Sequence, residues 1–462
     1  MSKQPELVKG LGLYGATSVV AGTMIGTAIF VVPGIMVQDV GSPWRVMLVW
    51  VFAGVLSLFG AFGYAELGAA LPEAGGEYVY LHRAYGPLWG FLFGWTQFFV
   101  AKTASIAAIA TGFMIYLGFF FPHLSKVFCE ASPAGLTLRL TGLQLGAAGL
   151  ILLLSAINVL GVRRSGAVQT IFTASKLGVL ALLVVLGLGL GHGSFAHFQT
   201  VVHSRAETGF VSAFGLAMVS ALWAYDGWNN LSMVAGEVAD PQRNMPRALI
   251  FGSMLVIVVY ALTNFAYFYV LSPAEVAGTG TVASDAAQRI LGTAGGAFVA
   301  VGVMVSSFAT LNGSILSGSR IPFAQARDGL FPPALAAVHS RFHTPAVAIA
   351  AQAVVAGLFA LSGQYEALFT KVIFSEWLFY ALVTAGIFVL RRRRPDLARP
   401  YRTWGYPLVP GIFVILAGLL LANTFYERRS DSLWGIVLMA TGIPAYYLWN
   451  LWQRRKSSQP RS

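Results

Sequence analysis

The sequence predicts an all-helical integral membrane protein of twelve transmembrane helices, of which the first and the sixth are discontinuous. Hydrophobic residues make up 56% of the chain and charged residues only 10%, whereas a soluble domain carries about a quarter charged residues. Apolar stretches of about eighteen residues or more recur along the whole length, and each can cross about 30 Å of hydrocarbon. This pattern excludes an ordinary water-soluble domain.

The spans follow one another without a linker, so 1–462 is predicted to form a single transmembrane domain. The predicted spans lie near 10–37, 44–71, 87–121, 141–160, 166–191, 209–236, 248–271, 295–319, 345–361, 367–390, 405–426 and 432–452. Because the interrupted spans are the first and the sixth, their order suggests a five-plus-five inverted repeat. Residues 10–191 would form the first repeat and 209–390 the second, and 405–452 would add two C-terminal helices.

The net charge of +12 is distributed in a way that indicates membrane topology. With the N-terminus inside, twenty Lys and Arg residues fall in inside segments and eight in outside loops. Cytoplasmic loops carry such an excess, so the chain is predicted to lie in the cell membrane with both termini cytoplasmic. The arginine run 391–394 would anchor this topology and could contact anionic lipids, and no nucleic acid is expected as a partner.

Motifs for catalysis, metal binding or cofactor binding are not visible in the sequence. Its seven histidines are scattered, and its one cysteine, Cys129, rules out a disulfide framework. No nucleophile–base pair and no phosphate loop is found. We therefore expect no cofactor, no metal and no enzymatic activity, with a receptor or a membrane-embedded enzyme as the alternative of a different class.

The first interruption lies at 21–27, inside the apolar run 9–37. Glycine costs a helix about 1 kcal/mol relative to alanine, so Gly22 and Gly26 permit local unwinding. Unwound backbone frees N–H groups at the start of the next half-helix, which suit a carboxylate, and carbonyls, which suit an ammonium. The alternative is a helix-packing face, since Gly22 and Gly26 have GxxxG spacing.

The second interruption lies at 223–229, inside the apolar run 209–236. Asp226 is central in this span, where an acidic side chain costs roughly a few kcal/mol unless it faces a cavity or a partner. Gly227 loosens the helix beside it, and Trp223 could cover a site there. The alternative is a polar residue satisfied by interhelical hydrogen bonds. Paired interruptions in two halves indicate a midplane site for a transported solute.

Three further ionisable residues lie within predicted spans: Lys102, Lys176 and Glu376. A lysine as deep as Lys176 cannot easily snorkel to the interface, so it needs a carbonyl, hydroxyl or carboxylate partner. Each of the three could also belong to a structural ion pair, and the sequence does not say which residues pair.

The two interruptions extend into longer motifs. These are GTMIGTAIF at 22–30, WAYDGWNN at 223–230 with GE at 236–237 and PQRNMP at 241–246, YAELG at 64–68, GGEY at 75–78, and LNGS at 311–314 with SR at 319–320. Together they resemble the L-type amino acid transporters of the amino acid–polyamine–organocation superfamily, over about 10–450 and in a bacterial-looking form. The resemblance implies the inverted-repeat fold and sodium-independent exchange of L-amino acids by alternating access.

The resemblance also implies a role for each interruption. Backbone N–H groups around Gly26, Thr27 and Ala28 would bind the substrate carboxylate. Carbonyls near Met24, Trp223 and Asp226 would bind the ammonium, and Trp223 would be the aromatic gate. The full predicted substrate-binding set is Thr23, Met24, Ile25, Gly26, Thr27, Ala28, Trp223, Ala224, Asp226, Asn229 and Glu376. Lys176 matches the lysine that replaces a sodium ion, and its amine would bridge Gly22 and Ser306.

Three departures from the family pattern bear on the substrate. Ala28 stands where glycine is common, Asp226 replaces a glycine of the animal members, and Glu376 stands where an uncharged residue is usual. We predict neutral, small to medium L-amino acids as substrates, with cationic amino acids or polyamines, carried with or without protons, as the alternative. Cys129 lies in the loop that joins animal members to a heavy subunit, but its offset differs, so we expect no heavy subunit.

Overall fold

The computed structural model describes eight stretches of the chain. They are residues 10–73, 75–131, 138–160, 165–190, 193–204, 209–342, 344–362 and 365–457. Six of the Lys and Arg residues in the topology prediction lie outside the described residues, namely Lys3, Lys9, Arg163, Arg164, Arg205 and Arg461.

Within these stretches the prediction of twelve apolar spans is confirmed. Nine helices are long and apolar enough to cross a membrane, one further span is a bent pair, and two shorter apolar helices complete the set. The bent pair is α1 (Leu13–Met24) with α2 (Ala28–Val40), and the shorter helices are α9 (Phe210–Tyr225) and α16 (Ala346–Ser362). The remaining spans are built from α3 (Pro43–Ala70), α5 (Pro87–Thr96) with η1 (Gln97–Ala101) and α6 (Lys102–Phe120), α7 (Gly142–Val159), α8 (Ser165–Gly189), α11 (Pro241–Val270), α14 (Thr293–Gly318), α17 (Tyr365–Arg393), α18 (Leu408–Glu427), and α19 (Arg429–Ala440) with α20 (Gly442–Ser457). Their assignment to repeats 10–191 and 209–390 stays a prediction.

Proline and glycine residues mark several helix ends. Proline occupies the first position of α3, α5 and α11, where its missing N–H has no helical partner to lose. Gly41 ends α2 with a left-handed φ of 71°, a conformation that costs glycine little. The outer faces carry exposed apolar side chains such as Leu152, Leu153 and Val258, which suit contact with hydrocarbon.

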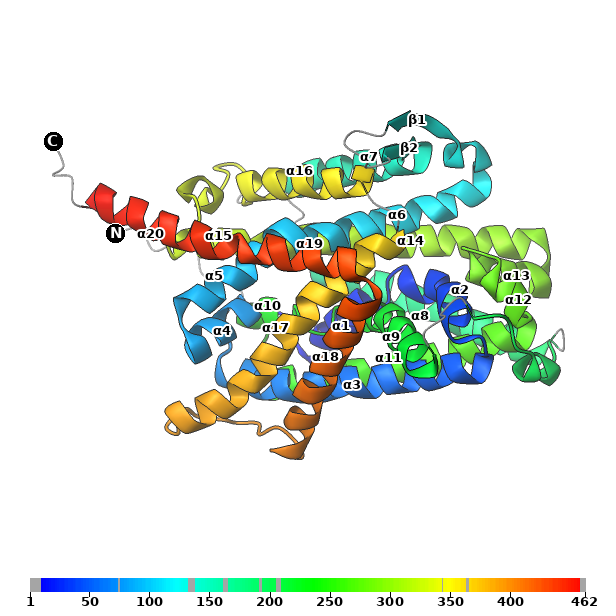
Figure 1. Ribbon diagram of the computed structural model, residues 1–462, viewed down its shortest axis with the longest axis horizontal. Coiled ribbons are helices and arrows are strands. Elements are labelled where there is room, and N and C mark those ends of the chain that lie inside the picture. The colour runs from blue at the N-terminus through cyan, green and yellow to red at the C-terminus, as the bar shows by residue number, and fades with distance from the viewer. Residues whose placement is uncertain are drawn as a thin grey trace.

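Short elements connect the spans at the two ends of the molecule. α4 (Glu77–Tyr85) and α15 (Arg320–Arg327) lie at one end, and α12 (Pro273–Ala277) and α13 (Val282–Leu291) lie at the opposite end (Figure 1). α10 (Asn230–Met233) and the 3₁₀ turns η2 (Pro122–Ser125), η4 (Phe195–Gln199), η5 (Ala235–Glu237) and η6 (Pro333–Ala336) complete the helical elements. Most spans run along the long axis, while α17 and α18 cross them obliquely (Figure 1).

One connection departs from the all-helical prediction. The loop 122–140 contains an antiparallel hairpin of β1 (Val127–Ala131) and β2 (Leu138–Thr141). Cys129 lies in β1 and is exposed with a free thiol. The sequence did not reveal this hairpin because its apolar alternation is only a few residues long.

A π-helical turn interrupts the third span. η1 joins α5 to α6, and Lys102 is the residue that follows it. A π-turn accommodates one residue more than the α-helix does over the same length, and such turns are frequent at functional sites.

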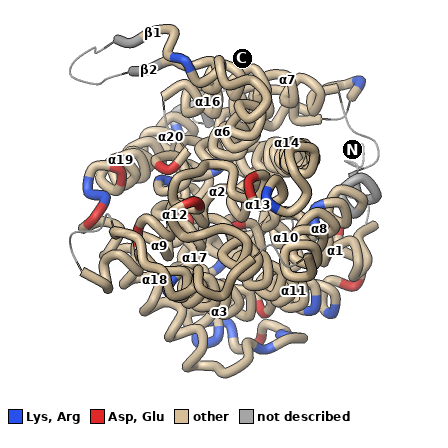
Figure 2. The backbone as a smooth tube through the Cα atoms, turned by 90° about the vertical axis from the view of Figure 1, so that its right-hand side faces the viewer, with Lys and Arg blue, Asp and Glu red and all other residues tan. Residues whose placement is uncertain are grey.

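Charged residues are sparse along the chain (Figure 2). Several ion pairs lie in the connections, such as Arg289 with Glu275 and Arg320 with Glu237. The charged residues inside the spans are therefore exceptions that call for a partner or a cavity.

Candidate functional site

The first interruption of the chain is an unwound segment of three residues. α1 ends at Met24, α2 begins at Ala28, and the two helices are bent by 41° relative to each other. Gly22 stays inside α1, so of the two glycines only Gly26 lies in the unwound part. The N–H groups of the first turn of α2 have no partner within the helix, and they carry the positive end of its dipole.

The second interruption depends on a glycine. α9 ends at Tyr225, Asp226 is extended, and Gly227 has φ +110°, a conformation that other residues rarely adopt. A Cβ atom on Gly227 would lie 3.0 Å from the carbonyl carbon and oxygen of Thr23. The glycine therefore allows both the turn and the close approach of the first interruption.

The two interruptions are bonded to each other. The Thr23 hydroxyl donates a hydrogen bond of 2.8 Å to the Gly227 carbonyl. The Tyr260 hydroxyl, from α11, lies 2.8 Å from the Met24 carbonyl and 3.1 Å from the Ala224 carbonyl. These contacts join α1, α9 and α11 at one depth.

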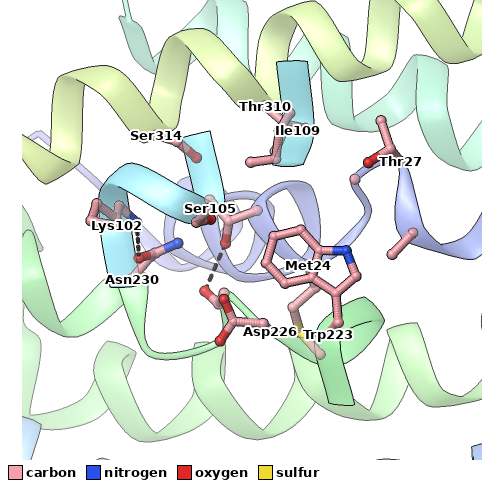
Figure 3. A pocket seen from close by; sticks show the side chains of 14 residues that line it. Met24, Thr27, Lys102, Ser105, Ile109, Trp223, Asp226, Asn230, Thr310 and Ser314 are labelled. Carbon is pink, nitrogen blue, oxygen red and sulfur yellow. Dashed lines mark hydrogen bonds between the residues drawn. The ribbon is translucent and has the colours of Figure 1, made fainter. Parts of the chain in front are cut away.

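A cavity lies where the interruptions meet. Its lining residues come from both interruptions and from α6 and α14: Thr23, Met24, Gly26, Thr27, Ala28, Lys102, Ser105, Ile109, Trp223, Asp226, Gly227, Asn230, Thr310 and Ser314. Lys102 and Asn230 lie at one end of the cavity, and Trp223 and Thr27 lie toward the other (Figure 3). Most of the lining side chains are small or polar.

Seven of the predicted binding residues line this cavity, and four do not. The four are Ile25, Ala224, Asn229 and Glu376. The side chains of Ile25 and Ala224 are buried in the core, and Asn229 donates to Glu77 at 2.5 Å instead. Glu376 bonds to Tyr380 behind the cavity. The neighbouring Asn230 takes the place at the cavity that the sequence suggested for Asn229.

The Met24 and Trp223 carbonyls predicted to bind the substrate ammonium already accept other hydrogen bonds. The Met24 carbonyl already accepts hydrogen bonds from the Tyr260 hydroxyl and, at 2.8 Å, from the Gly26 N–H. The Trp223 carbonyl accepts one from the Asp226 N–H at 3.3 Å. Met24 is thus a poor acceptor for a ligand ammonium in this conformation, and Trp223 keeps one lone pair free.

Trp223 lines one side of the cavity (Figure 3). Its indole N–H donates to the Tyr365 hydroxyl at 3.0 Å, and that hydroxyl lies 3.3 Å from the Thr27 hydroxyl. The indole also stacks on Phe369, with ring centroids 6.0 Å apart and planes at 12°. Trp223 therefore links the α9 interruption to Thr27 and to the first turn of α17.

Lys176 lies behind the first interruption and is almost completely buried. Its ammonium donates to the carbonyls of Gly22 and Ile25, each at 2.9 Å, and to the Thr310 hydroxyl at 2.5 Å. The expected contact with Gly22 is present because the last turn of a helix leaves its carbonyls without helical partners. The expected partner Ser306 is wrong: Thr310, one turn further along α14, makes the contact.

Ionisable groups meet behind the second interruption. The Tyr380 hydroxyl lies 2.8 Å from a carboxylate oxygen of Asp226 and 2.8 Å from one of Glu376. The Lys102 ammonium donates to the Asn230 side-chain oxygen at 3.2 Å. In α4, between the second and third spans, burial raises the pKa of the Glu77 carboxyl to about 7, against the opposing effect of the Asn229 hydrogen bond.

Half of the residues that line the cavity were not among the predicted binding residues. Ser105, Ile109 and Thr310 carry no charge and break no pattern, so nothing in the sequence distinguishes them from packing residues. Ser314 lies in the LNGS motif, but the motif assigns it no role. Lys102 was noticed as an intramembrane lysine but could not be assigned. Among the described residues, no group of three or more His, Cys, Asp or Glu side chains could hold a metal ion, and no metal was expected.

Comparisons with known proteins identify the family. The family model described as "Amino acid permease" matches residues 11–447. The chain is 33% identical to the b(0,+)-type amino acid transporter 1 of Mus musculus, covering 96% of this chain and 89% of that protein. It is 33% identical to the large neutral amino acids transporter small subunit 2 of Mus musculus, covering 97% and 82%. It is also 33% identical to the serine/threonine exchanger SteT of Bacillus subtilis, covering 96% and 97%.

These matches run through both interruptions and all the spans, and the relatives are transporters, not enzymes. They confirm the family that the sequence motifs indicated. The chain is a multi-pass membrane protein that belongs to the amino acid permease family.

Proposed function

We propose that the chain is a sodium-independent exchanger of neutral, small to medium L-amino acids that works by alternating access. The observation that carries this proposal is the cavity at the meeting point of the two interrupted helices, which Trp223 lines on one side and would gate. The carboxylate and the ammonium that all amino acids share would each meet a complementary backbone group in this cavity. Membership of the amino acid permease family supports amino acids as the substrate class.

The carboxylate would bind at the start of α2. The N–H groups of Thr27 and Ala28 line up with the positive end of the α2 dipole, and both residues line the cavity. The ammonium would bind toward the end of α9, where the helix dipole is negative and the carbonyls of Trp223 and Asp226 lie near the cavity.

Neutral side chains are favoured by the charges and the sizes of the lining residues. Lys102 brings a positive charge to the cavity, which disfavours a cationic substrate. Asp226 lines the cavity as well, but its carboxylate is engaged by the Tyr380 hydroxyl. Ser105, Thr310 and Ser314 leave room for short side chains. A carrier of cationic amino acids or polyamines is the second candidate, because Asp226 is an acid at the cavity.

Sodium independence follows from Lys176. Its ammonium binds two carbonyls of the first interruption and a hydroxyl of α14, so a tethered cation joins elements that a free cation could otherwise join. With this charge supplied by the protein, no sodium ion is needed to neutralise the freed carbonyls.

Topology and partners belong to the same proposal. The excess of Lys and Arg in alternate loops supports cytoplasmic termini, which would make the Trp223 side of the cavity the outer side. We infer that no heavy subunit is required, since the offset of Cys129 differs from that of the animal members. The exposed thiol of Cys129 makes this testable by comparing transport by the chain alone before and after Cys129→Ser.

The deciding experiment is counterflow in liposomes that contain only the purified chain. Vesicles preloaded with one amino acid are tested against labelled alanine, serine, leucine, lysine, arginine and a polyamine, in sodium and in choline media. We expect exchange of alanine, serine or leucine at equal rates in both media. Failure of all three neutral amino acids, with exchange of lysine, arginine or polyamine, would replace the substrate class by the cationic one.

A further inference from the structure

The contacts of Tyr380 require more hydrogen atoms than its hydroxyl carries. The hydroxyl oxygen lies 2.8 Å from both Asp226 and Glu376, yet it has one hydrogen and can donate it to only one carboxylate. The second contact is favourable when a carboxyl O–H donates to the phenolic oxygen, whereas an ionised carboxylate there would face an oxygen without a hydrogen.

The surroundings supply too little positive charge for two ionised carboxylates. In the described part of the chain, the titratable groups that interact with the pair or with Tyr380 are Tyr64 from α3, Glu77 from α4 and Lys102 from α6. With every acid ionised, three negative charges would face the single ammonium of Lys102, which is directed at Asn230. Glu376 is buried and Asp226 is half-buried, and one hydroxyl contacts both, so the two carboxylates cannot both ionise at low cost and a shared proton is the stable arrangement.

The pair spans two elements that alternating access must separate. Asp226 belongs to the α9 interruption, which Tyr260 and Thr23 tie to the first interruption, whereas Glu376 and Tyr380 belong to α17. Because these contacts tie the two interruptions together, opening of the cavity by alternating access would move them together relative to α17. The two carboxyl groups then part, their repulsion falls, and each can ionise in contact with water.

We propose that Asp226 and Glu376 are a proton-binding pair, bridged by Tyr380, which takes up one proton as the site closes over an amino acid and returns it to water as the site opens. The proton comes from the aqueous side that faces the open site, joins a carboxylate oxygen, and leaves as that O–H bond breaks. This inference rests on the proposed function, since it names the ion whose binding accompanies that of the amino acid.

The test measures protons taken up per amino acid bound. Purified chain in weakly buffered detergent with a pH-sensitive dye is mixed with L-alanine, L-serine or L-leucine, and binding is measured in parallel. We expect about one proton per bound amino acid, falling below about one tenth in Glu376→Gln and in Asp226→Asn. Glu77→Gln is the matched control: it removes a buried carboxyl that touches the same interruption through Asn229, and the ratio should persist. An unchanged ratio in Glu376→Gln, or an equal loss in Glu77→Gln, would overturn the proposal.

A second measurement is independent of transport. Binding of the amino acid at neutral pH should add the infrared C=O stretch of a protonated carboxyl, which should be reduced in Glu376→Gln and Asp226→Asn and shifted in Tyr380→Phe, which removes the bridging hydroxyl. A spectrum without any difference between the wild type and these variants would refute the shared proton. Absence of all amino-acid binding would instead refute the proposed function. A band that grows in the ligand-free protein as the pH falls, and that Glu376→Gln and Asp226→Asn both reduce, would still establish the pair.

Discussion

Replacing Lys176 by alanine tests the central mechanical claim of the structure. The ammonium makes three hydrogen bonds, two of 2.9 Å to carbonyls of the first interruption and one of 2.5 Å to Thr310 of α14. Hydrogen bonds to charged groups contribute about 1.5–3 kcal/mol each, and contributions from one cluster do not add fully. We take about 3 kcal/mol for the loss of the set, which corresponds to roughly a hundredfold in an equilibrium constant.

This loss of free energy applies to the closed form, in which the hydrogen bonds of Lys176 join α8 to α1 and α14. The rate of counterflow of a neutral amino acid should therefore fall roughly a hundredfold in Lys176→Ala. Lys176→Met keeps most of the apolar volume and should be equally impaired, because the carbonyls of Gly22 and Ile25 still lack a donor. Both variants, like the wild type, should transport at the same rate in sodium and in choline.

The matched control is Lys371→Ala on α17. Its ammonium bonds to Asp431 at 2.6 Å, but both side chains are partly exposed, at 21% and 27%. Such a pair contributes less than about 1 kcal/mol, so the rate should change less than about fivefold. Wild-type kinetics in Lys176→Ala would show that the ammonium is not needed to join the helices. Stimulation of the wild type by sodium would refute the tethered-cation argument.

Three further predictions concern the gate, the second interruption and pH. Trp223→Ala should raise the apparent half-saturation concentration in uptake assays, because the lid over the cavity is lost. Trp223→Phe, which can still stack on Phe369, should raise that concentration less. Equal concentrations for the wild type and both variants would count against the gate. Gly227→Ala should lower the melting temperature in detergent, because φ +110° costs alanine about 1–3 kcal/mol and the added Cβ would meet backbone atoms. Gly149→Ala is the control: no atom lies within 4 Å of the added Cβ, so the melting temperature should stay unchanged. The folded chain holds a proton on Glu77 up to about pH 7, whereas the unfolded chain releases it near its ordinary pKa, so the melting temperature should fall as pH rises through this window. Glu77→Gln should flatten that fall, and an unchanged slope would show that Glu77 is not its source.

The features that sequence predicted well are those that conflict with a uniform apolar helix. Both interruptions were located because Gly26 and Gly227 weaken a helix and Asp226 is costly in a span. Trp223 followed from its place beside the second interruption. The twelve spans follow from length and composition alone, because lipid requires every spanning backbone to satisfy its own hydrogen bonds.

The features that sequence could not predict depend on the direction of a side chain or on which turn of a helix carries it. Ser306 and Thr310 are four residues apart on one face of α14, so spacing alone does not decide which meets Lys176. Asn229 and Asn230 lie where the helix is interrupted, and without helical periodicity their side-chain directions cannot be inferred. Tyr260 and Tyr365 lie in apolar surroundings, where an aromatic residue is expected to serve packing.

A change in the π-turn η1 could alter which substrate the cavity favours. Because successive residues of a helix point about 100° apart, the extra residue in η1 sets the angle at which Lys102 leaves the helix axis. Deleting one residue from 97–101 would return the segment to an ordinary helix and rotate Lys102 relative to the residues that precede the turn. The charge of the cavity could then be altered by the loss of a single codon, while each residue that lines it kept its identity.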